Sequence, residues 1–225
     1  MATYDYPNDG KFHTRYSELA ACQTPAGAIR IAKQRLGLAE RVETKQMAFG
    51  TLRHDMWERE ARETGLSPEC FLNAVNKRWG VFETENGRAT ELFEGIVIHF
   101  TTDLIGLDEH SAVTEEEDGT RKAHGAVVID YKTATEMNTQ KHKQYYMGML
   151  QLPTYKLLLA PHGINIREGH YLLECWDRER KTLKGYVHIV KPVGLKELAA
   201  AKAMLRKGVE NLIAAEAMLK KQHNL

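Results

Sequence analysis

One apolar run constrains the fold more than any other part of the sequence. Residues 126–129 read Ala-Val-Val-Ile without interruption, and Asp130, Tyr131 and Lys132 follow directly. A short continuous apolar run of this kind is typical of a strand that is buried on both faces. Such a strand needs a sheet around it and helices that cover the sheet, so the run favours an α/β (α+β) fold.

Helical patterns dominate the sequence before that strand. Proline starts helices but disrupts their interiors, and serine is a good helix cap. The expected helices cover residues 16–36, with a cap at Ser17 and a break near Pro25, then residues 44–65, and residues 67–79 from Ser67. Residues 1–90 are therefore predicted to be mainly helical.

Strand patterns begin after Arg88, where β-branched and aromatic residues become frequent. We expect a strand within residues 91–110, a polar connection with an exposed acidic hairpin, the strand at 126–132, a helix over 138–159, and strands at 168–177 and 184–190. Pro153 predicts either a kink or a second helix start near Leu152. A long helix over 194–222 completes a single domain of residues 1–225, with its sheet core at 91–192 and a central mixed sheet flanked by helices.

Composition sets limits on the class of protein. The 225 residues are 43% hydrophobic and 27% charged, as in ordinary globular proteins, and the formal charge of +1 neither demands nor excludes nucleic acid. No apolar run reaches the roughly 18 residues of a membrane span, so we expect a cytoplasmic protein without a membrane partner. Cys22, Cys70 and Cys175 form no CxxC pair, and we interpret them as small buried hydrophobes.

Two carboxylates on strands and one histidine on a helix could form a metal site. They are Asp103, Asp130 and His54, with Asp108 as an alternative to Asp103. Hard oxygen ligands suit Mg²⁺ or Mn²⁺. Lys132 follows Asp130 by two residues, so both side chains point to one face of the strand, while Tyr131 is expected in the core. Taken singly, Asp130 and Lys132 are more typical of a solvated strand end and His54 of a packed or surface histidine, and Asp103 could as easily cap a turn.

Five sequence segments occur in an order that resembles a known family. They are Ser17–Pro25, Gly50–His54, the strand around Asp103, Val128–Thr133 with Asp130 and Lys132, and Leu150–Tyr155 with Gln151 and Tyr155. This order is similar to the RecB-like branch of the PD-(D/E)xK nuclease superfamily, over residues 12–160. The resemblance implies a restriction-endonuclease-like core.

The resemblance also implies roles for individual residues. The metal ligands of an Mg²⁺ or Mn²⁺ ion would be His54, Asp103, Asp130 and the backbone carbonyl of Tyr131. Lys132 would orient the attacking water, and Gln151 and Tyr155 would position the nucleic-acid strand and the catalytic groups. Many relatives carry an iron–sulfur cluster on four cysteines, whereas this chain has three and none after Cys175, so no cluster is expected.

DNA is the partner that the resemblance implies. Candidate DNA contacts are Arg30, Lys33, Arg35, Lys141, Lys143, Gln151 and Tyr155, with Lys202, Arg206 and Lys207 on the last helix. The implied activity is a compact, phage-type exonuclease that processes DNA ends or single strands in recombination and repair, together with a recombination protein, in a bacterium or a phage-infected cell. The alternatives are a structure-specific or restriction-type endonuclease and an inactive DNA-binding scaffold. Polarity, strand preference and oligomeric state are left open.

Overall fold

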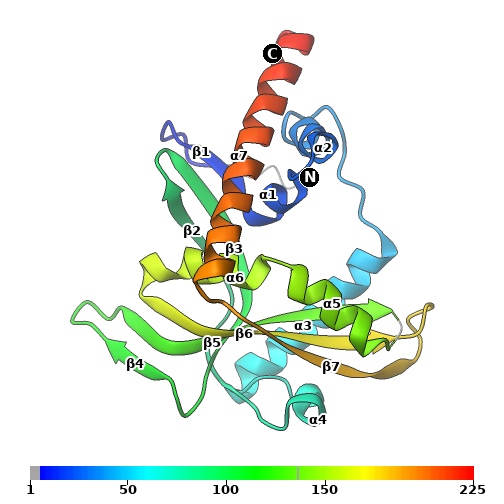
Figure 1. Cartoon of the computed structure of the whole chain (residues 1–225), viewed down its shortest axis with the longest axis vertical. Helices are drawn as coiled ribbons and strands as arrows, with labels where there is room; N and C mark the ends of the chain where they lie inside the picture. The colour runs from blue at the N-terminus through cyan, green and yellow to red at the C-terminus, as the bar shows by residue number, and fades with distance from the viewer. Residues whose placement is uncertain (1–5, 136) are drawn as a thin grey trace. The chain divides into compact units, whose positions relative to one another are not determined.

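The computed structural model describes residues 6–135 and 137–225. The chain divides into two compact units, which we describe separately: the first comprises residues 1–42, 87–100 and 199–225, and the second comprises Glu43–Asn86 and Thr101–Leu198. Strands β2 (Gly80–Phe93) and β3 (Ile96–Leu107) and helix α7 (Leu195–His223) each contribute residues to both units. All elements are labelled in Figure 1 where there is room.

The second unit contains a mixed sheet, as predicted. Its strand order is β3, β5 (Arg121–Thr135), β6 (Ile164–Trp176) and β7 (Leu183–Lys191). The β5 and β6 strands run parallel, and the β3–β5 and β6–β7 pairs are antiparallel. The short strand β4 (Ala112–Glu115) pairs with the start of β5, which confirms the predicted exposed hairpin.

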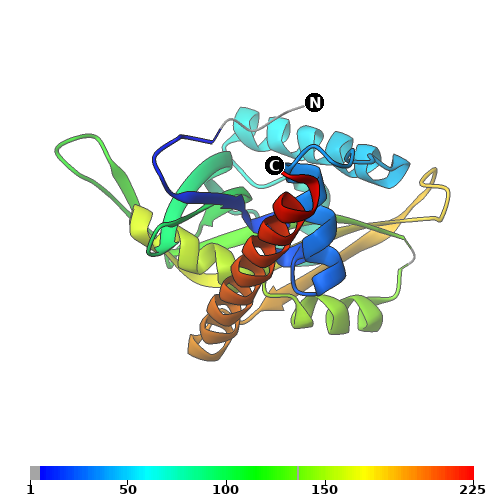
Figure 2. The ribbon, with the colours of Figure 1, turned by 90° about the horizontal axis from the view of Figure 1, so that it is seen from above.

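Helices cover both faces of this sheet. Figure 2 shows α3 (Lys45–Thr64) on one side of the strands and α5 (Thr139–Gly148) on the other. Helix α6 (Gln151–Leu159) contacts β5 and β6. Helix α3 begins where the Thr44 side chain accepts the N–H of Met47, and it ends at Gly65 in the left-handed conformation. The predicted helix over 44–65 is therefore confirmed.

The core of the second unit lies between α3 and the sheet. The ring of Tyr131 stacks on Phe71 with centroids 5.4 Å apart and packs against Trp57. Trp79 belongs to the same buried cluster. The predicted core positions of Tyr131, Trp57 and Trp79 are confirmed.

Several predicted elements are wrong in their bounds. Instead of one helix from Ser67 to Trp79, there are two short pieces, η1 (Glu69–Phe71) and α4 (Leu72–Val75), because Asn76 adopts a left-handed conformation with φ 61°. The single strand expected within 91–110 is part of a hairpin of β2 and β3, with Gly95 at φ 71° in the turn. Residues 80–90 are consequently strand rather than helix.

The helix expected over 138–159 is two helices. Helix α5 ends at Gly148 and α6 starts at Gln151, so Pro153 lies in the first turn of α6, where its missing N–H costs nothing. This confirms the second of the two alternatives for Pro153. The short helix η2 (Ala160–His162) then leads into β6.

The first unit is built from β1 (Phe12–Arg15), α1 (Tyr16–Ala21), α2 (Pro25–Arg35) and most of α7, and β1 pairs in parallel with residues 96–99 of β3. Ser17 does not cap α1, because the helix starts at Tyr16 with Arg15 as its cap residue. The break at Pro25 is confirmed, and Thr24 caps α2 there. Helix α7 approaches α1 closely, since a Cβ on Gly208 would lie 2.7 Å from the Leu19 carbonyl. Within the described ranges, no helix is long and apolar enough to cross a membrane.

Candidate active site

The first acidic side chain of the site joins two strands. Strands β3 and β5 pair directly at Leu104 with Ile129. One residue earlier in β3, the Oδ2 atom of Asp103 accepts the N–H of Tyr131 at 2.7 Å. A side-chain carboxylate thus takes the place of a backbone carbonyl in the ladder. The bond holds the Asp103 carboxylate next to the segment that carries Asp130 and Lys132.

Asp130 is fully buried and is held from two directions. Its Oδ1 atom accepts the Nε2 amide of Gln151 at 2.7 Å, and the same amide lies 2.9 Å from the Tyr155 hydroxyl. Its Oδ2 atom forms an ion pair with Nζ of Lys132. The predicted sharing of one strand face by Asp130 and Lys132 therefore holds, and the first turn of α6 closes the opposite side of the carboxylate.

A histidine and a second acid stand on the other side of Asp103. Nδ1 of His54 lies 3.5 Å from Oδ2 of Asp103 and 3.7 Å from Oε1 of Glu85. One ligand atom from each of His54, Glu85 and Asp103 falls within 4.8 Å of the others, which is close enough for all three to hold one ion.

Glu85 was not found from the sequence. It lies inside β2 with φ 46°, a conformation that is uncommon for residues other than glycine and that redirects a side chain in a strand. The only local signal is the Asn86-Gly87 pair that follows it, since these residues mark an irregularity in a strand pattern.

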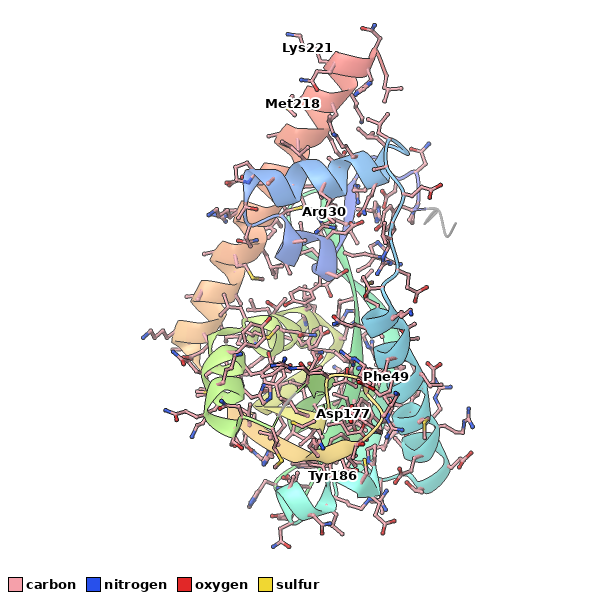
Figure 3. All side chains as sticks on the ribbon, turned by 90° about the vertical axis from the view of Figure 1, so that its right-hand side faces the viewer. Arg30, Phe49, Asp177, Tyr186, Met218 and Lys221 are labelled. Atoms are coloured by element: carbon pink, nitrogen blue, oxygen red, sulfur yellow. The ribbon has the colours of Figure 1, made fainter. Side chains whose placement is uncertain are left out.

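The position of His54 depends on the residue before it. Arg53 donates from Nε to Oε2 of Glu174 at 2.7 Å and forms a second bond to Oε1, and Trp176 donates to the same carboxylate at 2.9 Å. Glu174 lies on β6 and is fully buried. Phe49, one helical turn earlier in α3, packs edge-on against Trp176 and lies near the β6–β7 turn at Asp177, as Figure 3 shows. These contacts fix the start of α3 on the sheet.

Burial perturbs the acids and bases of the site. It raises the pKa of Asp130 to about 7, with the Lys132 ammonium opposing the shift and the Asp103 carboxylate adding to it. Burial also raises the pKa of Asp103. Burial alone would lower the pKa of Lys132, but the charges of Asp130 and Asp103 outweigh it, and the pKa of Lys132 is raised. Lys132 therefore stays protonated beside two carboxyl groups.

The donor set fits a divalent metal ion. Although Oδ2 of Asp130 is in ion-pair contact with Lys132, it receives no aligned hydrogen bond from the part of the chain that the structure describes. A buried carboxylate oxygen with an open lone pair needs a cation or a proton. Carboxylate oxygens with one imidazole are ligands that Mg²⁺ and Mn²⁺ accept.

The alternative ligand Asp108 lies in a different environment. It accepts Nη2 of Arg167 at 2.9 Å and Nζ of Lys77 at 3.2 Å. Although burial opposes ionisation, the hydrogen bonds from Arg167 and Lys77 lower the pKa of Asp108 well below its usual value. The charge of Asp108 is thus compensated by Arg167 and Lys77. The acid that lies beside His54 is Asp103.

The basic residues that were predicted to contact DNA divide into exposed ones and one partly buried cation, Arg35. Arg35 bonds to Glu18 at 2.9 Å and to the His13 carbonyl at 3.0 Å, and it pairs with Glu216, so its guanidinium serves the packing of the first unit rather than a free surface. The remaining basic side chains are exposed; they are Arg30 and Lys33 on α2, Lys141 and Lys143 on α5, and Lys202, Arg206 and Lys207 on α7.

Solved structures with a similar fold are exonucleases by name. A phage-related exonuclease from Haemophilus somnus 129PT superposes with a TM-score of 0.53 at 10% identity, over 94% of this chain and 97% of that chain. LHK-Exo from Laribacter hongkongensis, in complex with dAMP, superposes with a TM-score of 0.50 at 15% identity, over 96% of this chain and 94% of that chain. At this identity the likeness shows the fold. No curated protein matches the chain.

A family model matches the part of the sequence with the clearest motifs. Residues 117–224 match the model of the PD-(D/E)XK nuclease superfamily, and this range contains Asp130, Lys132, Gln151 and Tyr155. The mixed sheet, the two carboxylates at the β3–β5 junction and the lysine that follows the second carboxylate agree with that match. Over residues 117–224, the chain is thus similar to the PD-(D/E)XK nuclease superfamily.

Proposed function

We propose that this protein is a metal-dependent deoxyribonuclease that hydrolyses phosphodiester bonds. The observation that carries the proposal is the contact between a buried Asp130 and a protonated Lys132 next to the Asp103 carboxylate. The match of residues 117–224 to a nuclease superfamily model supports the reaction class, and DNA is the substrate that the two exonucleases of similar fold suggest.

The metal ion would be Mg²⁺ or Mn²⁺. Its ligands would be His54, Asp103, Asp130 and the backbone carbonyl of Tyr131, and Glu85 joins them because its carboxylate lies within the same cluster. When bound, such an ion lowers the pKa of a water molecule and stabilises negative charge on a phosphoryl oxygen. The chain's own residues must then hold the carboxylates ionised and keep them in place.

Lys132, Gln151 and Tyr155 would complete the catalytic machinery. The Lys132 ammonium orients the attacking water and offsets the charge that develops on the phosphate. Gln151 fixes Oδ1 of Asp130, which leaves Oδ2 for the metal side, and Tyr155 holds the Gln151 amide in that direction. A hydrogen-bonded second layer of this kind sets the orientation of a metal ligand.

An exonuclease that acts on DNA ends or single strands is the preferred form of this activity. It is favoured by the resemblance of the motif order to the RecB-like branch and by the names of the two similar structures. By the same analogy we place the protein in DNA recombination or repair, in the cytoplasm of a bacterium or of a phage-infected cell. Lys141 and Lys143 on α5, in the same unit as the site, are the basic residues that we expect to meet DNA.

One assay with two substrates tests the proposal. Closed circular plasmid and end-labelled linear DNA are incubated with the protein in Mn²⁺, Mg²⁺ or EDTA, and the Lys132→Met variant serves as the matched inactive control. Shortening of linear DNA without nicking of circles, dependent on metal and on Lys132, supports an exonuclease. Nicked circles would instead identify an endonuclease, and DNA binding without any cleavage would identify a scaffold and overturn the enzyme proposal.

A further inference from the structure

A hollow with a volume of about 430 Å³ lies where α5 contacts β7, outside the cluster of carboxylates. Three cations line it: Lys143 from α5, Arg167 from β6 and Lys191 from β7. One acid, Glu168, shares the lining, and its carboxylate is 3.2 Å from the imidazole of His170. The hollow is therefore predominantly basic, and its size suits a nucleotide-sized ligand.

Lys191 distinguishes this hollow from an ordinary basic surface. Its side chain is 5% exposed, and its ammonium donates to the Met147 carbonyl. Among the described residues no carboxylate lies within ion-pair distance of Lys191, although an ammonium has three protons to donate. Burial lowers the pKa of Lys191 and Glu197 only partly opposes this shift. A bound anion would satisfy the remaining donors and stabilise the charge.

The other two cations differ in their ion pairing. Arg167 forms an ion pair with Asp108, whose Oδ2 atom lies 2.9 Å from Nη2 of the arginine. Lys143 is exposed on α5, a helix without acidic residues. The remaining lining is apolar and comes from Met147, Val190 and Pro192. Cations beside an apolar wall match the phosphate and the deoxyribose of a nucleotide.

One cation of the hollow, Lys191, lies on the face of the sheet that carries the site. Lys191 is paired with Gly169, and Asp130 with Tyr171, in the registers of the sheet. Paired residues share a face and alternate residues of a strand share a face, so Lys191 and Asp130 lie on one face, about 12 Å apart by the spacing of strands and residues. The buried ring of Tyr146 of α5 packs at a tilt against Tyr171 of β6, the strand between them, with centroids 4.9 Å apart.

We propose that this hollow is a second DNA subsite, in which Lys191, Lys143 and Arg167 bind a backbone phosphate of the substrate strand a few nucleotides from the scissile bond. The inference rests on the proposed function, because it takes DNA as the ligand. The subsite holds the strand while the carboxylates and Lys132 act on it.

Binding of a fluorescein-labelled single strand, measured by anisotropy in EDTA over a range of salt concentrations, tests this subsite. Lys191→Met should weaken binding about tenfold and reduce the slope of log K against log salt by about 0.7, the value for one phosphate contact. Lys191→Arg should retain binding. Lys156→Met is the matched control, since Lys156 is a half-buried lysine of α6 whose pKa burial also lowers, and it does not line the hollow.

The outcomes separate the subsite from the proposed activity. Wild-type affinity and salt slope in Lys191→Met would overturn the subsite, even if the enzyme cleaves DNA normally. If Lys191→Met no longer binds inorganic phosphate but binds the labelled strand as the wild type does, the hollow is a site for free phosphate. This result would also overturn the DNA subsite. If Lys191→Met does not fold, Lys143→Met at the exposed rim must show the same loss of slope. Failure of the proposed function is read separately, as absence of cleavage by the wild-type protein.

Discussion

Oδ2 of Asp103 accepts the backbone N–H of Tyr131 at 2.7 Å, so an acid of β3 is bonded to the residue that stands between Asp130 and Lys132. An asparagine at this position keeps an oxygen that can accept the same N–H but loses the negative charge. We expect Asp103→Asn to keep the fold and to lose about a thousandfold in cleavage rate. Circular dichroism and single-turnover cleavage measure the two effects. An asparagine variant with normal turnover would remove Asp103 from the metal site.

Metal binding should depend on pH through Asp130. The pKa of Asp130 is about 7 in the folded protein, against 3.8 for an ordinary aspartate. The metal-free folded state therefore holds a proton that the unfolded chain has released, and the free energy of unfolding should fall as pH rises from about 4 to about 7. Mn²⁺ must displace this proton, so its affinity should increase up to about pH 7 and level off above it.

Electron paramagnetic resonance titration of Mn²⁺ and urea unfolding, both between about pH 5 and about pH 8, measure these dependences. Asp130→Asn should bind Mn²⁺ weakly throughout the range. Asp55→Asn, at an exposed position of the same unit, should keep the wild-type profile. Mn²⁺ affinity that does not change with pH would contradict the assignment of Asp130 as a ligand.

Glu85 should contribute to metal affinity although the sequence gives little sign of it. Its carboxylate lies 3.7 Å from Nδ1 of His54, within the cluster that includes Asp103. Glu85→Gln should weaken Mn²⁺ binding by about 10- to 100-fold, as removal of a ligand or of its nearest partner does. Glu83→Gln, two residues earlier in β2, is the control and should bind Mn²⁺ as the wild type does. Equal affinities for the two variants would place Glu85 outside the site.

The ion pair between Arg53 and Glu174 should be a stability determinant of the second unit. Glu174 is fully buried, so Arg53→Met leaves a carboxylate without compensation and should cost about 3–5 kcal/mol of unfolding free energy. The double variant with Glu174→Gln should recover part of the loss. Urea unfolding of the single and double variants measures the coupling between the two residues.

The pair of exposed Arg62 and partly buried Glu58 on the same helix supplies the comparison. Arg62→Met should change the unfolding free energy by less than about 0.5 kcal/mol, because solvent screens an exposed pair. Similar losses of unfolding free energy for Arg53→Met and Arg62→Met would show that the buried pair stabilises the fold no more than the surface pair does.

The sequence predicts those parts of the site that depend on local periodicity. Asp130 and Lys132 share a face because strand residues alternate, and Gln151 and Tyr155 share one because they are one helical turn apart. The helix with His54 is predictable from its cap at Thr44 and its glycine end at Gly65. These relationships need no knowledge of distant residues.

Other parts depend on contacts between segments far apart in the chain. Arg167 and Lys77, from other elements, form ion pairs with Asp108 and so favour Asp103 as the proposed metal ligand. Arg35 is a basic residue of the kind that contacts DNA, but it forms an ion pair with Glu216 of the last helix. Glu85 reaches the site through an irregular strand conformation, which sequence periodicity does not encode.

The alternation of Asp130, Tyr131 and Lys132 links activity to folding in an unusual way. Tyr131 stacks on Phe71 in the core, while its two neighbours face the opposite side of the sheet. A slip of β5 by one residue would place a carboxylate and an ammonium in the apolar core and expose the phenol ring to the substrate side. A chain with β5 in the wrong register would therefore be unstable as well as inactive. The packing of Tyr131 in the core thus selects the one register in which Asp130 and Lys132 face the site.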